Sequence, residues 1–155
     1  MCGSEVALES LVGNYLMGLN HPILYSKGKV LPLSATDSFP IEISVEGDKL
    51  AIAAGGEIVL LDMLGGSSPS WAAEDTLSFA LSPEVMAAEL ACSYNDLPRF
   101  IGTGFSQSQE GTIIYYTYRL VAFSEANDRI SFAGSLVWDD AGTVEMARTV
   151  FIAPN

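Results

Sequence analysis

The last third of the chain alternates apolar and polar residues over long stretches, which is the pattern of half-buried β-strands. From residue 143 to residue 152, every second position belongs to an apolar set that contains one charge: Val144, Met146, Arg148, Val150 and Ile152. Side chains alternate between the two faces of a strand, so this set is expected to face a core. Arg148 would need an acceptor or an aromatic ring there, because an unpaired buried charge is too costly.

Other alternating segments are bounded by short turns, among them Gly47-Asp48 and Gly55-Gly56. They predict strands over residues 39–45, 49–53, 57–64, 76–81, 100–106, 112–124, 129–139 and 143–153, and a loop with a short edge strand over residues 26–38. The strand over residues 57–64 is more fully apolar than the two before it and has the length of a buried strand. Short connections join antiparallel neighbours, so the second half is expected to form an up-and-down meander.

Two segments carry helical signals. Apolar residues from Leu8 onward follow helical spacing, but Gly13-Asn14 interrupts them, so a short helix is expected to run into a strand near residue 14. Further along, Ser82-Pro83-Glu84 is typical of a helix start, and this helix would end near Cys92.

These elements predict a mainly β protein that forms a single domain over residues 1–155. We expect an antiparallel up-and-down β-barrel of about eight strands with one or two short helices, because closure removes the edges of a sheet. A β-sandwich and an α+β fold are the alternatives. No apolar run approaches the roughly 20 residues of a membrane-spanning helix, so no transmembrane span is expected.

Charge excludes some partners. The chain carries 19 acidic and 7 basic residues, a net charge of −12. This charge repels phosphate backbones and anionic lipid headgroups, so no nucleic-acid binding is expected. Two interpretations of the acidic surface remain, which are solubility and a cationic partner.

The chain has two cysteines, Cys2 and Cys92. They could form one structural disulfide that ties the N-terminus to the body, or remain separate thiols. The start Met1-Cys2-Gly3-Ser4 has no signal peptide, but Cys-Gly-Ser resembles the first residues of a mature bacterial lipoprotein with a lipid anchor on Cys2. That resemblance implies a periplasmic, cell-envelope or secreted protein, and a cytoplasmic location is the alternative.

Signatures of catalysis and of metal or cofactor binding are weak. His21 is the only histidine and lies beside Pro22, and no Cys or His cluster has metal-ligand spacing. Gly102-Thr103-Gly104 lacks the third glycine of a dinucleotide-binding loop. We therefore predict no catalytic residues, no metal and no cofactor, and lean against an enzyme.

Aromatic residues gather on the strands predicted over residues 112–124 and 129–139. Gly134, in the middle of an apolar face, leaves space for a large neighbour or for a ligand. If the barrel holds a cavity, its expected lining combines aromatic bodies with a few polar groups: Tyr116, Tyr118, Phe132, Leu136, Trp138, Met146 and Arg148. Arg148 would anchor an anionic head group, or close one end of the barrel by stacking on a ring.

Three residues at the two ends of the chain carry a family resemblance. Gly13 and Tyr15, in Leu11-Val12-Gly13-Asn14-Tyr15, and the inward Arg148 resemble the pattern of lipocalin-like calycins, which open with Gly-x-Trp and close with a basic residue across the Trp. Tyr replaces Trp here. The resemblance implies structural roles for Gly13 and Tyr15, and an eight-stranded barrel with a small apolar cavity at its mouth.

Three functions remain open. The first is binding of a small apolar or amphipathic ligand in the barrel. The second is a non-catalytic structural or interaction protein with a filled interior and an acidic partner surface. The third is a small-barrel isomerase or cyclase, which needs a buried carboxylate beside the cavity. Glu42, Glu57, Asp62 and Glu145 lie in predicted strands, and Glu42 and Glu145 are expected to point outward. The oligomeric state is not predicted.

Overall fold

The computed structural model describes residues 6–26, 29–32, 38–64, 97–107, 109–111, 113–124, 129–140 and 144–155. Within strands, it does not describe the side chains of residues 20–26, 29–32, 124, 138–140 and 144–149. The strand predicted over residues 76–81, the helix predicted after Ser82, and Cys2 and Cys92 lie outside the described residues.

A short 3₁₀ helix and nine β-strands make up the described part. The helix η1 spans Leu8–Leu11. The strands are β1 Gly13–Ser26, β2 Lys29–Pro32, β3 Phe39–Glu46, β4 Lys49–Ala54, β5 Glu57–Leu64, β6 Arg99–Gln107, β7 Ile113–Ser124, β8 Ile130–Asp140 and β9 Val144–Pro154. Positive φ angles of 65°, 61° and 85° at Gly47, Gly55 and Gly56 form the predicted turns between β3, β4 and β5.

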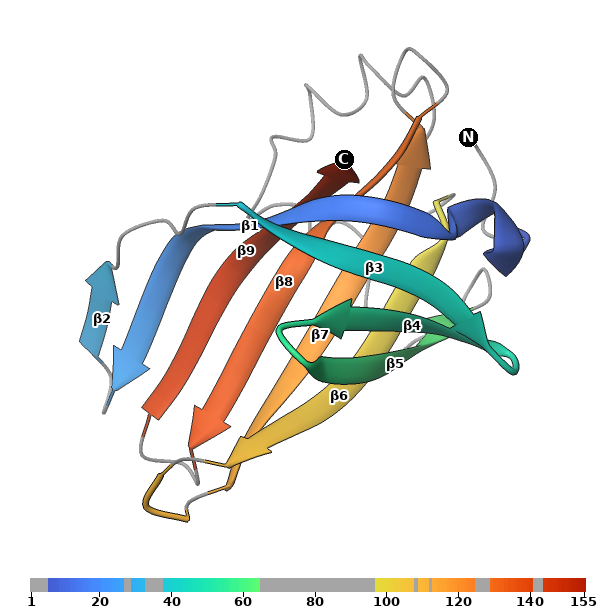
Figure 1. The fold of residues 1–155 in the computed structure, drawn as a ribbon. Helices are drawn as coiled ribbons and strands as arrows, with labels where there is room; N and C mark the ends of the chain where they lie inside the picture. The colour runs from blue at the N-terminus through green and yellow to red at the C-terminus, as the bar shows by residue number, and fades with distance from the viewer. Residues whose placement is uncertain are drawn as a thin grey trace.

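The strands form one antiparallel sheet in the order β2-β1-β3-β4-β5-β6-β7-β8-β9, and β1 also pairs with β9 (Figure 1). This last pairing closes β1 and β3–β9 into an eight-stranded barrel. β2 continues β1 as a short hairpin beyond the ring. The predicted fold class, a mainly β protein with a closed antiparallel barrel, is confirmed, and the edge strand predicted within residues 26–38 is β2.

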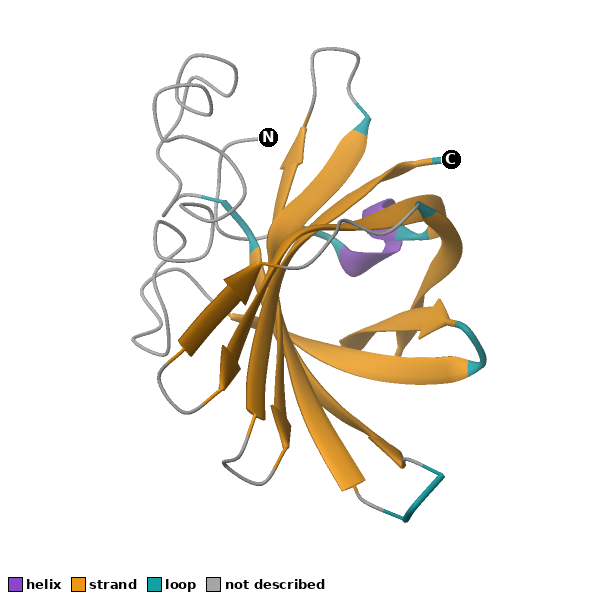
Figure 2. Cartoon of the chain, turned by 90° about the vertical axis from the view of Figure 1, so that its left-hand side faces the viewer, coloured by secondary structure: helices purple, strands orange, loops and turns teal. Residues whose placement is uncertain are grey.

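Unequal strand lengths make the barrel wider at one end. β1, β7, β8 and β9 have 14, 12, 11 and 11 residues, whereas β3, β4 and β5 have 8, 6 and 8. β5 pairs with β6 only from Asp62–Ile101 to Leu64–Arg99, so the remainder of β6 runs on beside β7 alone. The long strands spread apart toward this end, which we call the flared end (Figure 2).

The core fills the other end of the barrel. It contains the fully buried Phe100 and Phe132, whose rings meet edge to face at 6.0 Å, with Tyr15 edge-on to Phe132 at 5.8 Å. Met17, Ile43, Leu50, Leu61 and Leu120 have no exposed surface. All of these lie at alternate positions of their strands, as the sequence pattern predicts.

The first segment combines the two predicted structures. η1 lasts one turn, and β1 begins at Gly13, where helical spacing gives way to alternation. The buried hydroxyl of Tyr15 donates a hydrogen bond of 2.8 Å to the carbonyl of Leu11 at the end of η1. This bond satisfies a carbonyl that the short helix leaves without a partner in its own backbone.

Two sequence interpretations need correction or refinement. The more fully apolar β5 is half-buried, because Ile58 and Leu60 point outward and are 66% and 39% exposed. The space at Gly134 admits neither a ligand nor a side chain, since a Cβ there would lie 1.9 Å from the carbonyl oxygen of Arg119. Gly134 therefore lets β7 and β8 approach closely.

Candidate ligand-binding site

A cavity of about 190 Å3 lies between the core and the flared end of the barrel. Five successive strands, β4 to β8, contribute its lining: Ile52, Ala54, Glu57, Val59, Ser106, Tyr116, Tyr118 and Leu136. Tyr116 and Tyr118 are each 7% exposed and Leu136 is 2% exposed, whereas Glu57 is exposed. The cavity therefore combines apolar side chains with polar groups, and has a carboxylate where it opens.

Tyr116 reaches across β6 to β5. Its hydroxyl donates a hydrogen bond of 3.0 Å to Oε2 of Glu57. The path is open because its register partner on β6 is Gly104, which has no side chain. Tyr118 lies next to it, edge to face at 5.9 Å, and the Tyr118 hydroxyl is 4.0 Å from the sulfur of Met17. The two tyrosines thus form one wall, with Glu57 at its outer end.

Burial and the carboxylate both keep these tyrosines protonated. Desolvation, and to a smaller extent the negative charge of Glu57, together raise the pKa of Tyr118 to about 12. The pKa of Tyr116 is also raised, first by desolvation and then by its hydrogen bond to Glu57. The negative charge of Glu57 therefore acts on groups inside the cavity as well as at its opening.

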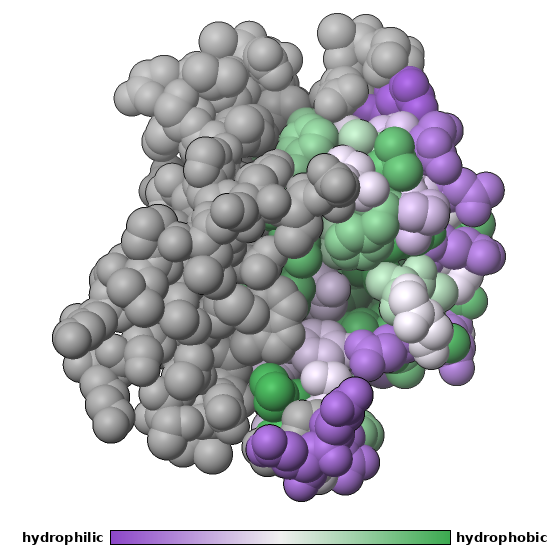
Figure 3. All heavy atoms as spheres, turned by 60° about the vertical axis from the view of Figure 1, so that its left-hand side comes forward, coloured by the Kyte–Doolittle hydropathy of each residue, from purple (hydrophilic) through white to green (hydrophobic). Residues whose placement is uncertain are grey.

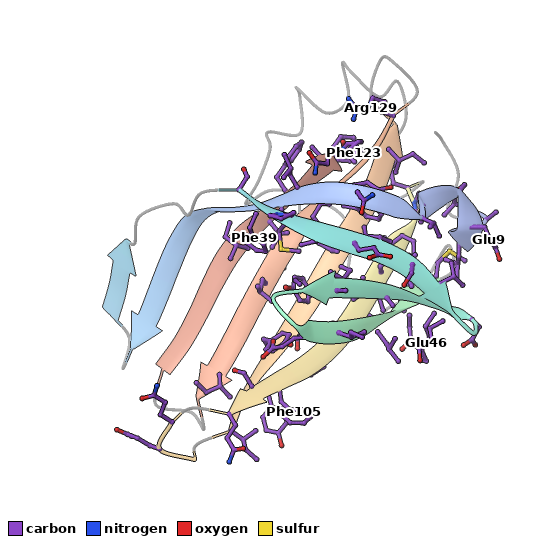
Figure 4. The ribbon with its side chains drawn as sticks, in the orientation of Figure 1. Glu9, Phe39, Glu46, Phe105, Phe123 and Arg129 are labelled. Carbon is purple, nitrogen blue, oxygen red and sulfur yellow. The ribbon has the colours of Figure 1, made fainter. Side chains whose placement is uncertain are left out.

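A groove of about 420 Å3 adjoins the cavity on the outside, between the diverging parts of β5 and β6. It shares Glu57, Val59 and Tyr116 with the cavity lining and adds residues of both strands: Ile58, Leu60, Thr103, Gly104 and Phe105. Phe105 is 65% exposed and points away from the barrel near the end of β6 (Figure 4). The centroid of its ring lies 6.4 Å from that of Tyr115. On the face seen in Figure 3, hydrophobic residues gather in the middle of the described surface.

The structure brings together three of the seven residues predicted to bind a ligand, which are Tyr116, Tyr118 and Leu136. Phe132 lies deeper, fully buried in the core. The side chains of Trp138, Met146 and Arg148 lie outside the described residues. The register nevertheless places residue 148 opposite Leu136, which in turn pairs with Tyr118. Whether any of the seven binds a ligand stays a prediction.

Sequence reasoning missed the β4 and β5 side of the cavity, which comprises Ile52, Ala54, Glu57 and Val59. Alternation contained the signal for Glu57, because it places Glu57 on the same face as Val59 and the buried Leu61. A charged residue among the inward positions of a strand indicates a polar site in the interior, and sequence reasoning applied this argument to Arg148 but not to Glu57. Its position at the start of β5, beside the Gly55-Gly56 turn, gave no reason to expect a cavity there.

Other site chemistry is limited in this part of the chain. No group of three or more His, Cys, Asp or Glu residues that could hold a metal occurs among the described residues. The same residues contain no helix of the length and hydropathy that crossing a membrane requires. Glu42 is exposed, as predicted.

Comparisons with known proteins give no family for this chain. No family model matches it, and neither a curated protein nor a solved structure is significantly similar. The architecture, a closed antiparallel barrel of eight strands, is compatible with a calycin-like fold. The class that the fold and cavity define is therefore a small β-barrel with an opening at one end.

Proposed function

We propose that this protein binds a small apolar or amphipathic ligand inside its barrel, as lipocalin-like proteins do. The observation that carries the proposal is the cavity of about 190 Å3, with apolar walls from Ile52, Val59 and Leu136 and polar groups at one end. Ligand sites typically combine such walls with a few polar groups that orient the ligand.

The cavity volume limits the size of the ligand. An apolar cavity of about 150 Å3 is enough to bind one benzene ring, whereas sites for larger ligands usually have about 300–1,000 Å3. A volume of 190 Å3 therefore suits a single ring with a short substituent. A longer molecule would have to extend into the adjoining groove of 420 Å3.

A fluorescence titration with the neutral apolar probe N-phenyl-1-naphthylamine, whose three rings would occupy the cavity and extend into the adjoining groove, tests the proposal. Its emission rises when it leaves water, and we expect saturable binding. Ala54→Phe, which places a ring in the cavity, should abolish binding. Ala53→Phe is the matched control, because Ala53 pairs with the exposed Glu42 and Ile58 on the outer face of β4. Equal binding of the probe by both variants would reject the cavity as the binding site. So would a wild type that binds neither the probe nor, in calorimetry, a compound with a single ring.

The same titration separates the two rival functions. A wild-type barrel that binds no probe and retains no small molecule in native mass spectrometry would favour the structural or interaction protein with a filled interior. The isomerase or cyclase needs a buried carboxylate, and Glu57 is exposed. An envelope or extracellular location, and a lipid on Cys2, stay predictions from the first residues.

A further inference from the structure

The polar end of the cavity is an acceptor site. The only hydroxyl hydrogen of Tyr116 is donated to Glu57, so the phenol oxygen keeps only acceptor capacity. Tyr116 is the one hydrogen-bond partner that the described residues give Glu57, and the carboxylate has acceptor positions left over. The pair therefore offers acceptors and a negative charge to whatever enters the opening.

No positive charge balances this carboxylate among the described lining residues. Both the cavity and the groove include Glu57, and neither includes a described Lys, Arg or His. Ser106 contributes a hydroxyl that can donate or accept. The whole chain adds to the effect, since its net charge is −12. A ligand with an anionic head group would face repulsion at this position.

Aromatic surface lies directly behind the carboxylate. Tyr116 and Tyr118 stand edge to face at 5.9 Å and line the same wall. The faces of aromatic rings attract cations, and a carboxylate next to them strengthens that attraction. An ammonium group has three donors and no acceptor, which complements Glu57 and Tyr116.

We propose that the ligand of this cavity is a small primary amine with an apolar body of about one ring. Its ammonium binds Glu57 and the oxygen of Tyr116, and its body lies against Ile52, Val59 and Leu136. This inference rests on the proposed ligand-binding function and names the chemical class of the ligand. It assigns the head group to Glu57, a residue of β5, and not to Arg148.

Three matched compounds test the charge of the head group: 2-phenylethylamine, 2-phenylethanol and 3-phenylpropionate. They share a phenyl ring and a two-carbon spacer and differ in carrying an ammonium, a hydroxyl or a carboxylate. At pH 7 the amine is protonated. In competition with N-phenyl-1-naphthylamine, the amine should bind about tenfold more tightly than the alcohol, as a charge-assisted hydrogen bond permits, and the acid most weakly.

The variant Glu57→Gln tests whether the carboxylate is responsible. It keeps the shape and an acceptor for Tyr116 but removes the charge, so the affinities for amine and alcohol should then differ by less than about threefold. Glu42→Gln is the matched control. It makes the same change in net charge on the outer face of β3, where Glu42 is exposed, and should keep the preference.

Each outcome separates this inference from the proposed function. If the probe binds but the alcohol or the acid matches the amine, the amine proposal is overturned and ligand binding stands. A preference for the acid would return the head group to Arg148. A preference for the amine that survives Glu57→Gln also overturns the proposal. If neither the probe nor any phenyl compound binds, the proposed function itself fails.

Discussion

The ring of Tyr116 lies over Gly104, its register partner on β6, so closely that a Cβ at residue 104 would stand 2.6 Å from the ring. This contact is what lets the Tyr116 hydroxyl pass β6 and reach Glu57 on β5. Gly104 leaves the space that the Tyr116 ring occupies, so the geometry of the cavity opening depends on both residues.

Substituting Gly104 should therefore disturb the opening more than the fold. In Gly104→Ala the new methyl meets the far end of a side chain that can move, so we expect a loss of about 1 kcal/mol in unfolding free energy and weaker probe binding. In Gly102→Ala the methyl would lie 2.3 Å from the backbone oxygen of Leu60, which cannot move away. That variant should lose about 3 kcal/mol. Urea unfolding measures both losses of unfolding free energy. Equal losses would mean that the Tyr116 ring does not move aside for the new methyl group.

The bond between Tyr116 and Glu57 should appear as a coupling energy. Tyr116→Phe removes the donor, and Glu57→Gln removes the charge of the acceptor. Because Glu57 is exposed and regains water, each single change should cost only about 0.5–1.5 kcal/mol. In a double-mutant cycle the double variant should lose less than the sum of the two single variants. Additive losses would show that the 3.0 Å bond contributes nothing measurable to stability.

Alkaline pH should destabilise the protein through Tyr118. Its pKa rises from the ordinary value near 10 to about 12 in the folded state, chiefly through desolvation. Between these values the unfolded chain loses the proton and the folded chain keeps it, so this contribution is complete below about pH 10 and falls as pH rises toward 12.

Absorbance titration of the phenolate gives the measurement. A component with a pKa of about 12 should be present in the wild type and absent from Tyr118→Phe. The variant should also lose less unfolding free energy between about pH 9 and about pH 11. Tyr115→Phe, which removes a tyrosine that is 56% exposed, is the control and should leave that component in place.

Tyr15 should stabilise the start of the barrel through its hydroxyl. Tyr15→Phe removes the buried 2.8 Å bond to the carbonyl of Leu11, and we expect a loss of about 1 kcal/mol in unfolding free energy. The amide of Val12, which donates to Glu9 at the end of η1, should exchange faster with deuterium. Unchanged exchange at Val12 would mean that η1 is held by other contacts.

The sequence predicted the barrel well and the cavity in part, for physical reasons. Alternation and turn glycines depend on neighbouring residues only, and they located β3–β9 closely. The cavity instead depends on where strands stop pairing, such as at Asp62 and Ile101, which no local pattern specifies. Tyr116 and Tyr118 could be named because alternation puts both on one inward face. Glu57 was missed because it lies at the start of β5 beside a turn, and because its bond to Tyr116 depends on Gly104, a residue far away in the sequence.

β2 has a consequence for how this molecule meets other copies of itself. Among the described strands it pairs with β1 on one side and ends the sheet order on the other, so its outer peptide groups are where a foreign strand could add. It has only four residues, begins with Lys29 and ends with Pro32, which has no amide hydrogen to donate. Intermolecular growth of the sheet is thereby disfavoured at β2, and mutual repulsion between chains of charge −12 acts against it as well.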